Sequence, residues 1–178
     1  MLLKNLINNI SNNNKKIIIT GLSTNSKKVK KNYIFFAIKG KKINGEKFIK
    51  EAVANGASVI VCSKTCKVKQ KVLTIKTNKI RYLLSDISSK FYKLKPSNII
   101  AVTGTNGKTS VADLFYQILR TKKIPVSTIG TLGIKYNNKI IKTDLTSPDT
   151  ISIHKYLYFL KKKNINNVII EASSHGLD

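Results

Sequence analysis

A short glycine loop between an apolar run and an amphipathic segment constrains the fold more than any other feature. A strand is expected over Asn98–Thr103, the loop Gly-Thr-Asn-Gly-Lys-Thr follows at 104–109, and an amphipathic helix is expected over Ser110–Thr121. Glycines let backbone N–H groups close around phosphate oxygens, and the helix start adds partial positive charge. Lys108 can reach the β and γ phosphates, and the Thr109 hydroxyl can ligate Mg²⁺. The loop therefore predicts a nucleotide-phosphate site.

One departure from the general pattern and one weaker alternative bear on this interpretation. Val102 stands where the first glycine of the general Walker A pattern would lie, so the loop is a shortened form of that pattern. A glycine turn that merely joins a strand to a helix would not require Lys-Thr at the helix start.

The elements after Pro96 are typical of an α/β domain with a mostly parallel sheet. Open sheets of this kind bind ligands at the carboxyl ends of their strands, where Glu171 ends the last apolar run. A carboxylate at the end of a buried strand is costly unless it has a partner, so Glu171 is expected to hold a cation. The other expected elements are strands at Pro125–Thr128 and Asn167–Ala172, a hairpin at Ile134–Ile141 turning at Asn137-Asn138, and a helix at Thr150–Lys163.

The chain before Pro96 is expected to form a smaller α/β domain. Gly56 stands where a helix C-terminal cap should lie, and Pro96 should stop the helix before it. Two domains are therefore predicted, 1–95 and 96–178. The elements expected in the first are helices at Leu2–Ile10, Glu46–Asn55 and Ile80–Leu94, and strands at Ile17–Thr20, Tyr33–Ile38, Ser58–Cys62 and Val72–Ile75.

The formal net charge of +25 invites a nucleic-acid interpretation, because clustered cations release counterions when they bind phosphates. The lysines are instead spread along the whole chain, and arginine occurs only at Arg81 and Arg120. A solvated surface is favoured over a nucleic-acid footprint.

The cysteines and the apolar runs set further bounds. Cys62 and Cys66 are spaced as C-x3-C, which is neither the redox C-x-x-C nor part of a zinc-site pattern, so ordinary reduced cysteines are expected. No apolar run is long enough to span a bilayer, and the amino terminus lacks the features of a signal peptide. A cytoplasmic protein without a membrane contact is expected.

Three motifs resemble the Mur ligase family. TGTNGKTS at 103–110 resembles the phosphate loop that Mur ligases share with folylpolyglutamate synthetases. STNSKKV at 23–29, with the stretch 33–61, is similar to the UDP-binding domain of the MurE and MurF types, although Asn25 and Lys27 stand where that family has Asp and Arg. EASSHGL at 171–177 resembles the MurE signature. The resemblance implies a small N-terminal UDP-binding domain followed by the first part of a P-loop ATPase-type central domain, in a truncated chain.

The resemblance also implies roles for individual residues. The catalytic residues would be Lys108 and Glu171, and the Mg²⁺ ligands would be Thr109 and Glu171. ATP phosphates would be held by Gly104, Thr105, Asn106, Gly107, Lys108, Thr109 and Ser110. The UDP-sugar would contact Thr24, Ser26, Lys41, Lys42 and Ile43, and the muramoyl-peptide would contact Thr146, Ser147 and Ser173. Ser26 is equally a turn former, and Ser147 is equally a helix cap with Pro148 at the first helical position.

The implied reaction is ATP-dependent ligation of meso-diaminopimelate or L-lysine to UDP-MurNAc-L-Ala-D-Glu through an acyl phosphate. Two alternatives stay open: a related ligase of the MurF or folylpolyglutamate type, and a non-catalytic module that binds nucleotide or RNA. A monomer is expected.

Overall fold

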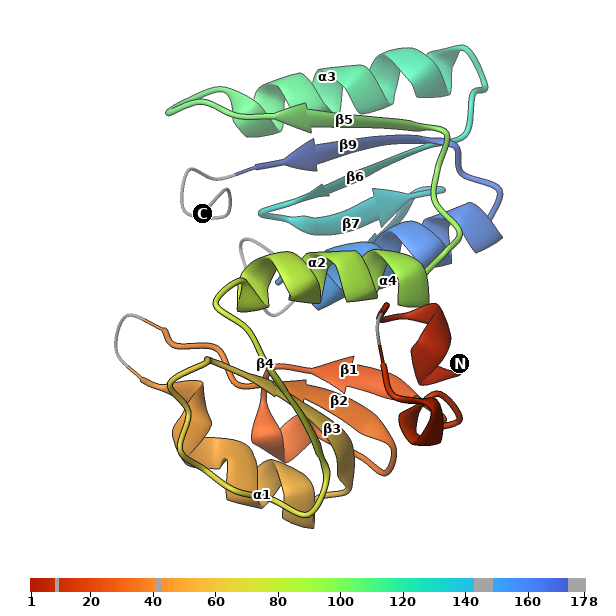
Figure 1. The fold of residues 1–178 in the computed structure, drawn as a ribbon. Coiled ribbons are helices and arrows are strands. Elements are labelled where there is room, and N and C mark those ends of the chain that lie inside the picture. The colour runs from red at the N-terminus through yellow and green to blue at the C-terminus, as the bar shows by residue number, and fades with distance from the viewer. Residues whose placement is uncertain (9, 41–42, 143–148, 173–178) are drawn as a thin grey trace. The chain divides into compact units, whose positions relative to one another are not determined.

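The computed structural model describes residues 1–8, 10–40, 43–142 and 149–172. They form two compact α/β units, Met1–Phe91 and Tyr92–Asp178 (Figure 1). The domain limits predicted from Pro96 stay a prediction. Within the described residues, no helix has the length and apolar character needed to cross a membrane.

Unit 1 is built on a parallel four-stranded sheet in the order β1-β2-β3-β4. Both faces of its central strands are buried, which explains why these strands are continuously apolar instead of alternating. One face carries Phe35, Ile60 and Cys62, which pack with Ile49 and Ala52 of α1. The elements are β1 (Gly21–Ser23), β2 (Tyr33–Phe36), α1 (Ile49–Ala54), β3 (Ala57–Cys62), β4 (Leu73–Lys76) and α2 (Ile80–Phe91).

The helix predicted over Leu2–Ile10 is wrong. Leu3–Asn5 form only a 3-10 turn, and Leu2 makes an isolated antiparallel bridge to Ile18. Leu3 and Leu6 are fully buried, so the apolar spacing was real, but Asn5 and Asn8 favour turns over helix. The strand predicted over 17–20 is reduced to that bridge.

Three other features of unit 1 can be compared with the predictions: the start of α1, its C-terminal cap and the two cysteines. The helix predicted from Glu46 begins as a 3-10 turn, Gly45–Phe48, before α1. Gly56 has φ +104, which confirms the predicted C-terminal cap. Cys62 and Cys66 are buried and unbridged, and burial together with the neighbouring Cys66 thiol raises the pKa of Cys62 to about 12.

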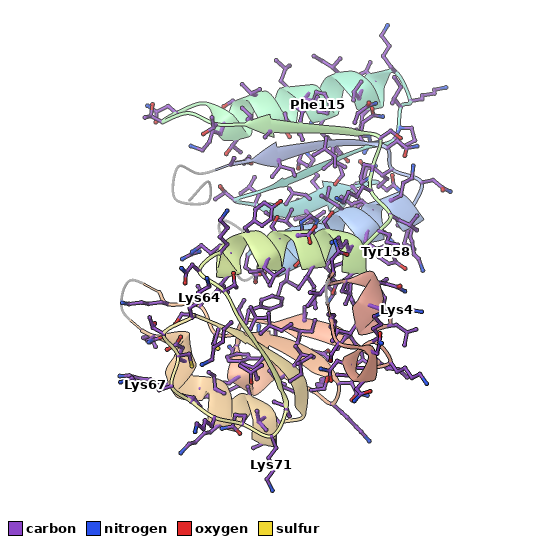
Figure 2. The ribbon with its side chains drawn as sticks, in the orientation of Figure 1. Lys4, Lys64, Lys67, Lys71, Phe115 and Tyr158 are labelled. Carbon is purple, nitrogen blue, oxygen red and sulfur yellow. The ribbon has the colours of Figure 1, made fainter. Side chains whose placement is uncertain are left out.

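Several lysine side chains of unit 1 reach outward at separate positions. Lys4, Lys67 and Lys71 are exposed and point away from the ribbon (Figure 2). The prediction that nucleic acid is not a partner remains a prediction.

Unit 2 is built on a five-stranded mixed sheet in the order β5-β9-β6-β7-β8. Strands β5, β9 and β6 are parallel, and β7 and β8 continue the sheet as an antiparallel meander. The predicted hairpin turn is confirmed, because Asn137 and Asn138 both have positive φ (44 and 60). The elements are β5 (Asn98–Val102), α3 (Lys108–Thr121), β6 (Val126–Gly130), β7 (Gly133–Tyr136), β8 (Lys139–Ile141), α4 (Thr150–Lys162) and β9 (Asn167–Glu171).

The two helices of unit 2 cover opposite faces of this sheet (Figure 1). Leu157 and Leu160 of α4 pack with Ile129, Ile134 and Val168 in one core. On the other face α3 buries only Ala112 and Tyr116. The apolar stripe of α3 faces away from the sheet, with Val111, Leu114 and Ile118 exposed by 50%, 60% and 52%.

Candidate functional site

The phosphate loop lies at the carboxyl end of β5, beside the carboxyl end of β9. Val102 and Glu171 are register partners, and Ala172 N donates to Val102 O at 2.8 Å. Gly107 has φ +81, a backbone conformation that favours glycine. A Cβ added there would meet no heavy atom within 4 Å, so glycine is required by the backbone conformation and not by a lack of space. Because Gly107 is also the N-cap residue of α3, the N–H groups of the first helical turn point toward the loop.

Lys108 folds back over this loop. Its Nζ donates to Gly104 O at 2.6 Å and to Thr105 O at 3.4 Å. The ammonium therefore sits at the loop, where phosphate oxygens are stronger acceptors than these two carbonyls.

Glu171 is brought to the loop from β9, 62 residues further along the chain than Thr109. Its side chain is only 8% exposed. Thr109 Oγ1 donates to Glu171 Oε2 at 2.8 Å, and Thr131 Oγ1 donates to the same oxygen at 3.3 Å. A Cβ on Gly130 would overlap the Glu171 carboxyl group, so the carboxyl group can lie here only while residue 130 is glycine.

Sequence reasoning missed Thr131 and Gly130. Both lie at the carboxyl end of β6, which is the edge of the sheet where ligands were expected. The Gly-Thr pair after a predicted strand was the available signal, but β6 becomes a neighbour of β9 only through the strand order.

The oxygens of Thr109, Thr131 and Glu171 fit a magnesium ion. Mg²⁺ prefers oxygen ligands and takes few of them from the protein, because phosphate oxygens and waters supply the rest. None of the described basic side chains forms an ion pair with Glu171, so this buried carboxylate has a charge left to neutralise. Clusters of three or more His, Cys, Asp or Glu suited to a metal are absent from the described part of the chain.

A cavity of about 410 Å³ opens beside Thr109 and Glu171. Lys135 of β7 and Asp113 of α3 line it and form an ion pair at 2.6 Å. The hydrogen bond from Lys135 lowers the pKa of Asp113. The cavity therefore opens directly beside the threonine and the carboxylate to which the sequence assigns Mg²⁺.

The UDP-sugar contacts expected in unit 1 are only partly described. Thr24 and Ser26 follow the carboxyl end of β1, with Thr24 exposed and Ser26 buried. The Ser26 hydroxyl donates to Glu51 at 2.7 Å, and Asn55 Nδ2 donates to Ser26 O at 3.0 Å. These two bonds tie Ser26 to α1 and the residue after it, and the turn itself is closed by Val29 N, which donates to Ser26 O at 3.1 Å.

The remaining predicted contacts cannot be placed together. Ile43 is 59% exposed. Lys41, Lys42, Thr146, Ser147 and Ser173 lie outside the described residues. The predicted capping role of Ser147 is wrong, since Asp149 is the N-cap of α4 and accepts from Ser152 N at 2.9 Å.

Two family models match the chain on either side of the boundary between its units. The model of the Mur ligase middle domain matches residues 102–178, and the model of the Mur ligase family, catalytic domain, matches residues 18–92. The chain belongs to the Mur ligase family. The phosphate loop and Glu171 both lie in the part that matches the middle domain.

Within the Mur ligase family, the relatives and the solved structure described next carry one ligase name. The chain is 39% identical over 178 residues to a UDP-N-acetylmuramoyl-L-alanyl-D-glutamate–2,6-diaminopimelate ligase of Wigglesworthia glossinidia brevipalpis, covering 94% of this chain and 36% of that protein. It is 38% identical over 160 residues to the ligase of the same name from Zymomonas mobilis, covering 90% and 33%.

A solved structure of a ligase of this name superimposes with a TM-score of 0.84 at 26% identity. The superposition covers 99% of this chain and 37% of the chain of the solved structure. The chain thus spans about a third of the length of the curated relatives it matches.

Proposed function

We propose that the chain supplies the UDP-sugar-binding part and the ATP-phosphate-binding part of a MurE-type ligase in peptidoglycan precursor synthesis. The whole enzyme would join an amino acid to UDP-MurNAc-L-Ala-D-Glu with consumption of ATP. The names of the relatives favour 2,6-diaminopimelate over L-lysine as that amino acid. We expect the reaction in the cytoplasm, where ATP and UDP-sugars are made.

The proposed reaction has two steps. A carboxylate oxygen of the D-Glu residue attacks the γ-phosphorus of ATP, the bond from that phosphorus to the β–γ bridging oxygen breaks, and ADP leaves. The amine then attacks the acyl carbon, the bond to the phosphate oxygen breaks, and inorganic phosphate leaves as the amine loses a proton. No side-chain nucleophile is required.

The chain's own residues would act mainly by offsetting charge. Two polyanions have to meet, and the N–H groups of the loop with Lys108 would bind the β and γ phosphates. Thr109 and Glu171 would hold Mg²⁺, which offsets the charge on the transferred phosphoryl group. Thr131 would keep the Glu171 carboxylate oriented through its 3.3 Å hydrogen bond.

The observation that carries this proposal is the meeting of Lys108, Thr109 and Glu171 at one edge of the sheet. The loop follows β5, the carboxylate ends β9, and Thr109 Oγ1 lies 2.8 Å from Glu171 Oε2. A buried acidic group beside a lysine-threonine phosphate loop is suited to a nucleotide triphosphate with its metal ion.

Titration calorimetry with Mg-ATP tests the nucleotide half of the proposal. Lys108→Ala should weaken binding by about tenfold or more, since it removes a charged hydrogen-bond donor to phosphate. Lys122→Ala, which changes an exposed lysine just beyond the other end of α3, is the matched control and should bind normally. Normal affinity in the Lys108→Ala chain would rule out this phosphate site.

The UDP-sugar half needs a separate titration. UDP-MurNAc-L-Ala-D-Glu should bind the chain without ATP, and Lys108→Ala should leave that binding unchanged because unit 1 has its own sheet. Absence of binding by the folded chain would remove the UDP-sugar role and leave a nucleotide-binding module.

A further inference from the structure

A groove with its own polar groups lies between the C-terminal half of α3 and the β7–β8 hairpin. Its volume is about 480 Å³, and it shares Arg120 and Asn138 with an adjoining cavity of about 400 Å³. Lys108, Thr109 and Glu171 do not line it, although Lys135 and Ile140 line both this groove and the cavity beside Thr109. The groove is therefore distinct from the proposed phosphate site at the other end of α3.

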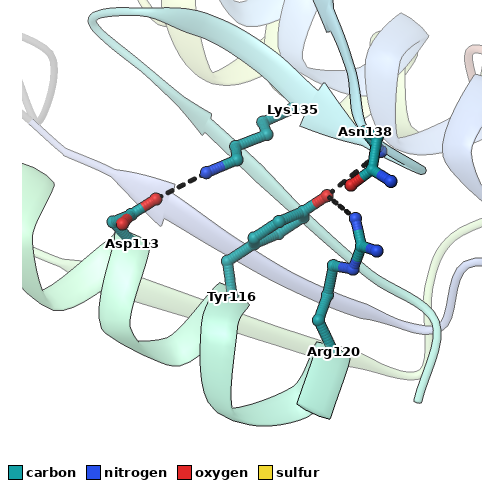
Figure 3. A network of polar contacts seen from close by, with 5 residues as sticks. All are labelled: Asp113, Tyr116, Arg120, Lys135 and Asn138. Atoms are coloured by element: carbon teal, nitrogen blue, oxygen red, sulfur yellow. Dashed lines mark hydrogen bonds and ion pairs between the residues drawn. The ribbon is translucent and has the colours of Figure 1, made fainter. Parts of the chain in front are cut away.

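Tyr116 forms the buried wall of this groove. The residue is only 1% exposed, and its hydroxyl oxygen accepts from Arg120 Nη1 at 3.3 Å and from Asn138 N at 3.4 Å (Figure 3). A phenol that accepts these bonds still has its own proton to donate. None of the described residues accepts that proton. A buried donor without an acceptor is costly, so the Tyr116 hydroxyl needs an acceptor that the groove itself does not supply.

The side chains around Tyr116 make the groove positive. Lys135 Nζ lies 4.5 Å from the centre of the Tyr116 ring, and the Arg120 guanidinium lies 5.7 Å from it. Lys135 is paired with Asp113, but Arg120 forms no ion pair within the described residues. Lys123 lines the adjoining cavity, and neither cavity has an acidic residue in its described lining.

The C-terminal end of α3 could weaken an anion site, because its last carbonyls carry partial negative charge. Several of these carbonyls already accept hydrogen bonds. Thr121 Oγ1 donates to Gln117 O at 2.9 Å, Lys122 N donates to Ile118 O at 3.3 Å, and Ile124 N donates to Leu119 O at 2.9 Å. The free donors of Arg120 and Tyr116 therefore dominate the groove.

We propose that this groove binds an oxyanion, a phosphate or a carboxylate, through the Tyr116 hydroxyl and the Arg120 guanidinium. One ligand oxygen accepts the Tyr116 proton, and Arg120 supplies charge and further N–H donors. Lys123 and Lys135 add charge from the two sides of the groove.

Arginine side-chain NMR of the 178-residue chain tests the proposal directly. The chain has only two arginines, Arg81 in unit 1 and Arg120, so an Arg81→Gln and an Arg120→Gln variant assign both Nε–H signals. Inorganic phosphate and acetate are titrated separately, with ionic strength held constant by sodium chloride. We expect the Arg120 signal to shift and saturate with at least one anion, while the Arg81 signal does not saturate.

Saturation by phosphate, by acetate or by both identifies which oxyanion the groove accepts. Tyr116→Phe keeps the ring and removes the donor, and it should weaken binding by about tenfold. Lys108→Ala removes the lysine of the phosphate loop and should leave the Arg120 titration unchanged, so this test does not depend on the proposed function.

Three outcomes would overturn the proposal. The two arginine signals could shift in parallel without saturation, which is general screening. The Arg120 response could vanish in the folded Lys108→Ala chain, which assigns it to the phosphate loop. The affinity could be the same in Tyr116→Phe as in the parent chain, which removes the hydroxyl from the site.

Discussion

At the scale of single residues, Glu171 can lie against β6 only because residue 130 has no side chain. A Cβ at this position would overlap the carboxyl group that Thr109 and Thr131 hold. The glycine is therefore part of the site, although it offers no functional group.

Gly130→Ala is expected to displace the Glu171 carboxylate and weaken Mg²⁺-dependent nucleotide binding. Overpacking of this kind should also lower the free energy of unfolding by about 1–3 kcal/mol. Calorimetric titration of ADP with and without Mg²⁺, together with urea unfolding, measures both effects. Lys122→Ala is the control, because Lys122 is exposed beyond the end of α3 and away from Glu171. Unchanged Mg²⁺ dependence in Gly130→Ala would contradict the placement of Glu171.

The sequence could predict those site residues whose roles depend on local order. Lys108 and Thr109 are recognised because they stand in a fixed order between a strand and a helix, and Glu171 is recognised because it ends an apolar run. Thr131 and Tyr116 could not be found in this way. Their partners, Glu171 and Asn138, are determined by strand order and hairpin register.

At the scale of elements, α4 carries a histidine whose charge the fold disfavours. His154 Nδ1 is buried without a hydrogen-bond partner among the described residues. Burial, and secondarily the charge of Lys95, lowers the pKa of His154 below its ordinary value of 6.5. The unfolded chain therefore binds this proton more readily than the folded chain does.

Acidification through and below 6.5 should reduce the free energy of unfolding by the His154 contribution. Urea unfolding between about pH 5 and 8 measures this slope. His154→Leu should flatten it, whereas His175→Gln, which changes the chain's only other histidine, should retain it. A slope that is equal in the parent and His154→Leu chains would show that α4 is not the pH-sensitive element.

Helix α3 has its larger apolar side turned outward. Leu114 and Ile118 are exposed by 60% and 52%, and the fully buried residues of the helix are Ala112 and Tyr116. The apolar spacing predicted the helix correctly, but spacing does not tell which of two apolar sides packs on the sheet.

The double variant Leu114→Gln, Ile118→Gln should reduce self-association of the chain without lowering its melting temperature. Exposed apolar patches favour association, and these two side chains stabilise little within the chain itself. Light scattering against concentration and thermal unfolding measure the two effects. Ala112→Gln is the contrasting control and should destabilise, because Ala112 is 2% exposed. A large loss of stability in the double variant would mean that the stripe is packed.

At the scale of the whole molecule, the chain has two sheets, and a buried core accompanies each of them. Each unit should therefore unfold as its own cooperative step. Under the proposed function Mg-ADP would bind the folded form of unit 2, and it should then stabilise only that step, by about 2.7 kcal/mol at a hundredfold excess over its Kd.

Calorimetric unfolding with and without Mg-ADP measures this difference. Lys108→Ala should abolish the shift while keeping both steps. A single transition that moves as a whole with nucleotide would contradict the independence of the two units.

The α/β class and most elements could be predicted from the sequence because apolar runs, glycines and prolines act locally. The order of strands could not. The insertion of β9 between β5 and β6 does not follow from local pattern, because it depends on contacts between segments that are distant in the sequence. The missing N-terminal helix does have a local signal in its asparagines, which the prediction set below the apolar spacing.

The central place of β9 has a consequence for synthesis. While a ribosome has delivered only β5, α3 and β6, the two parallel strands have no neighbour to join them, since β9 lies between them. Residues 167–171 supply both that neighbour and the Glu171 carboxylate. The phosphate loop therefore leaves the ribosome well before its acidic partner, and the same later segment both joins β5 to β6 and brings the carboxylate to the loop.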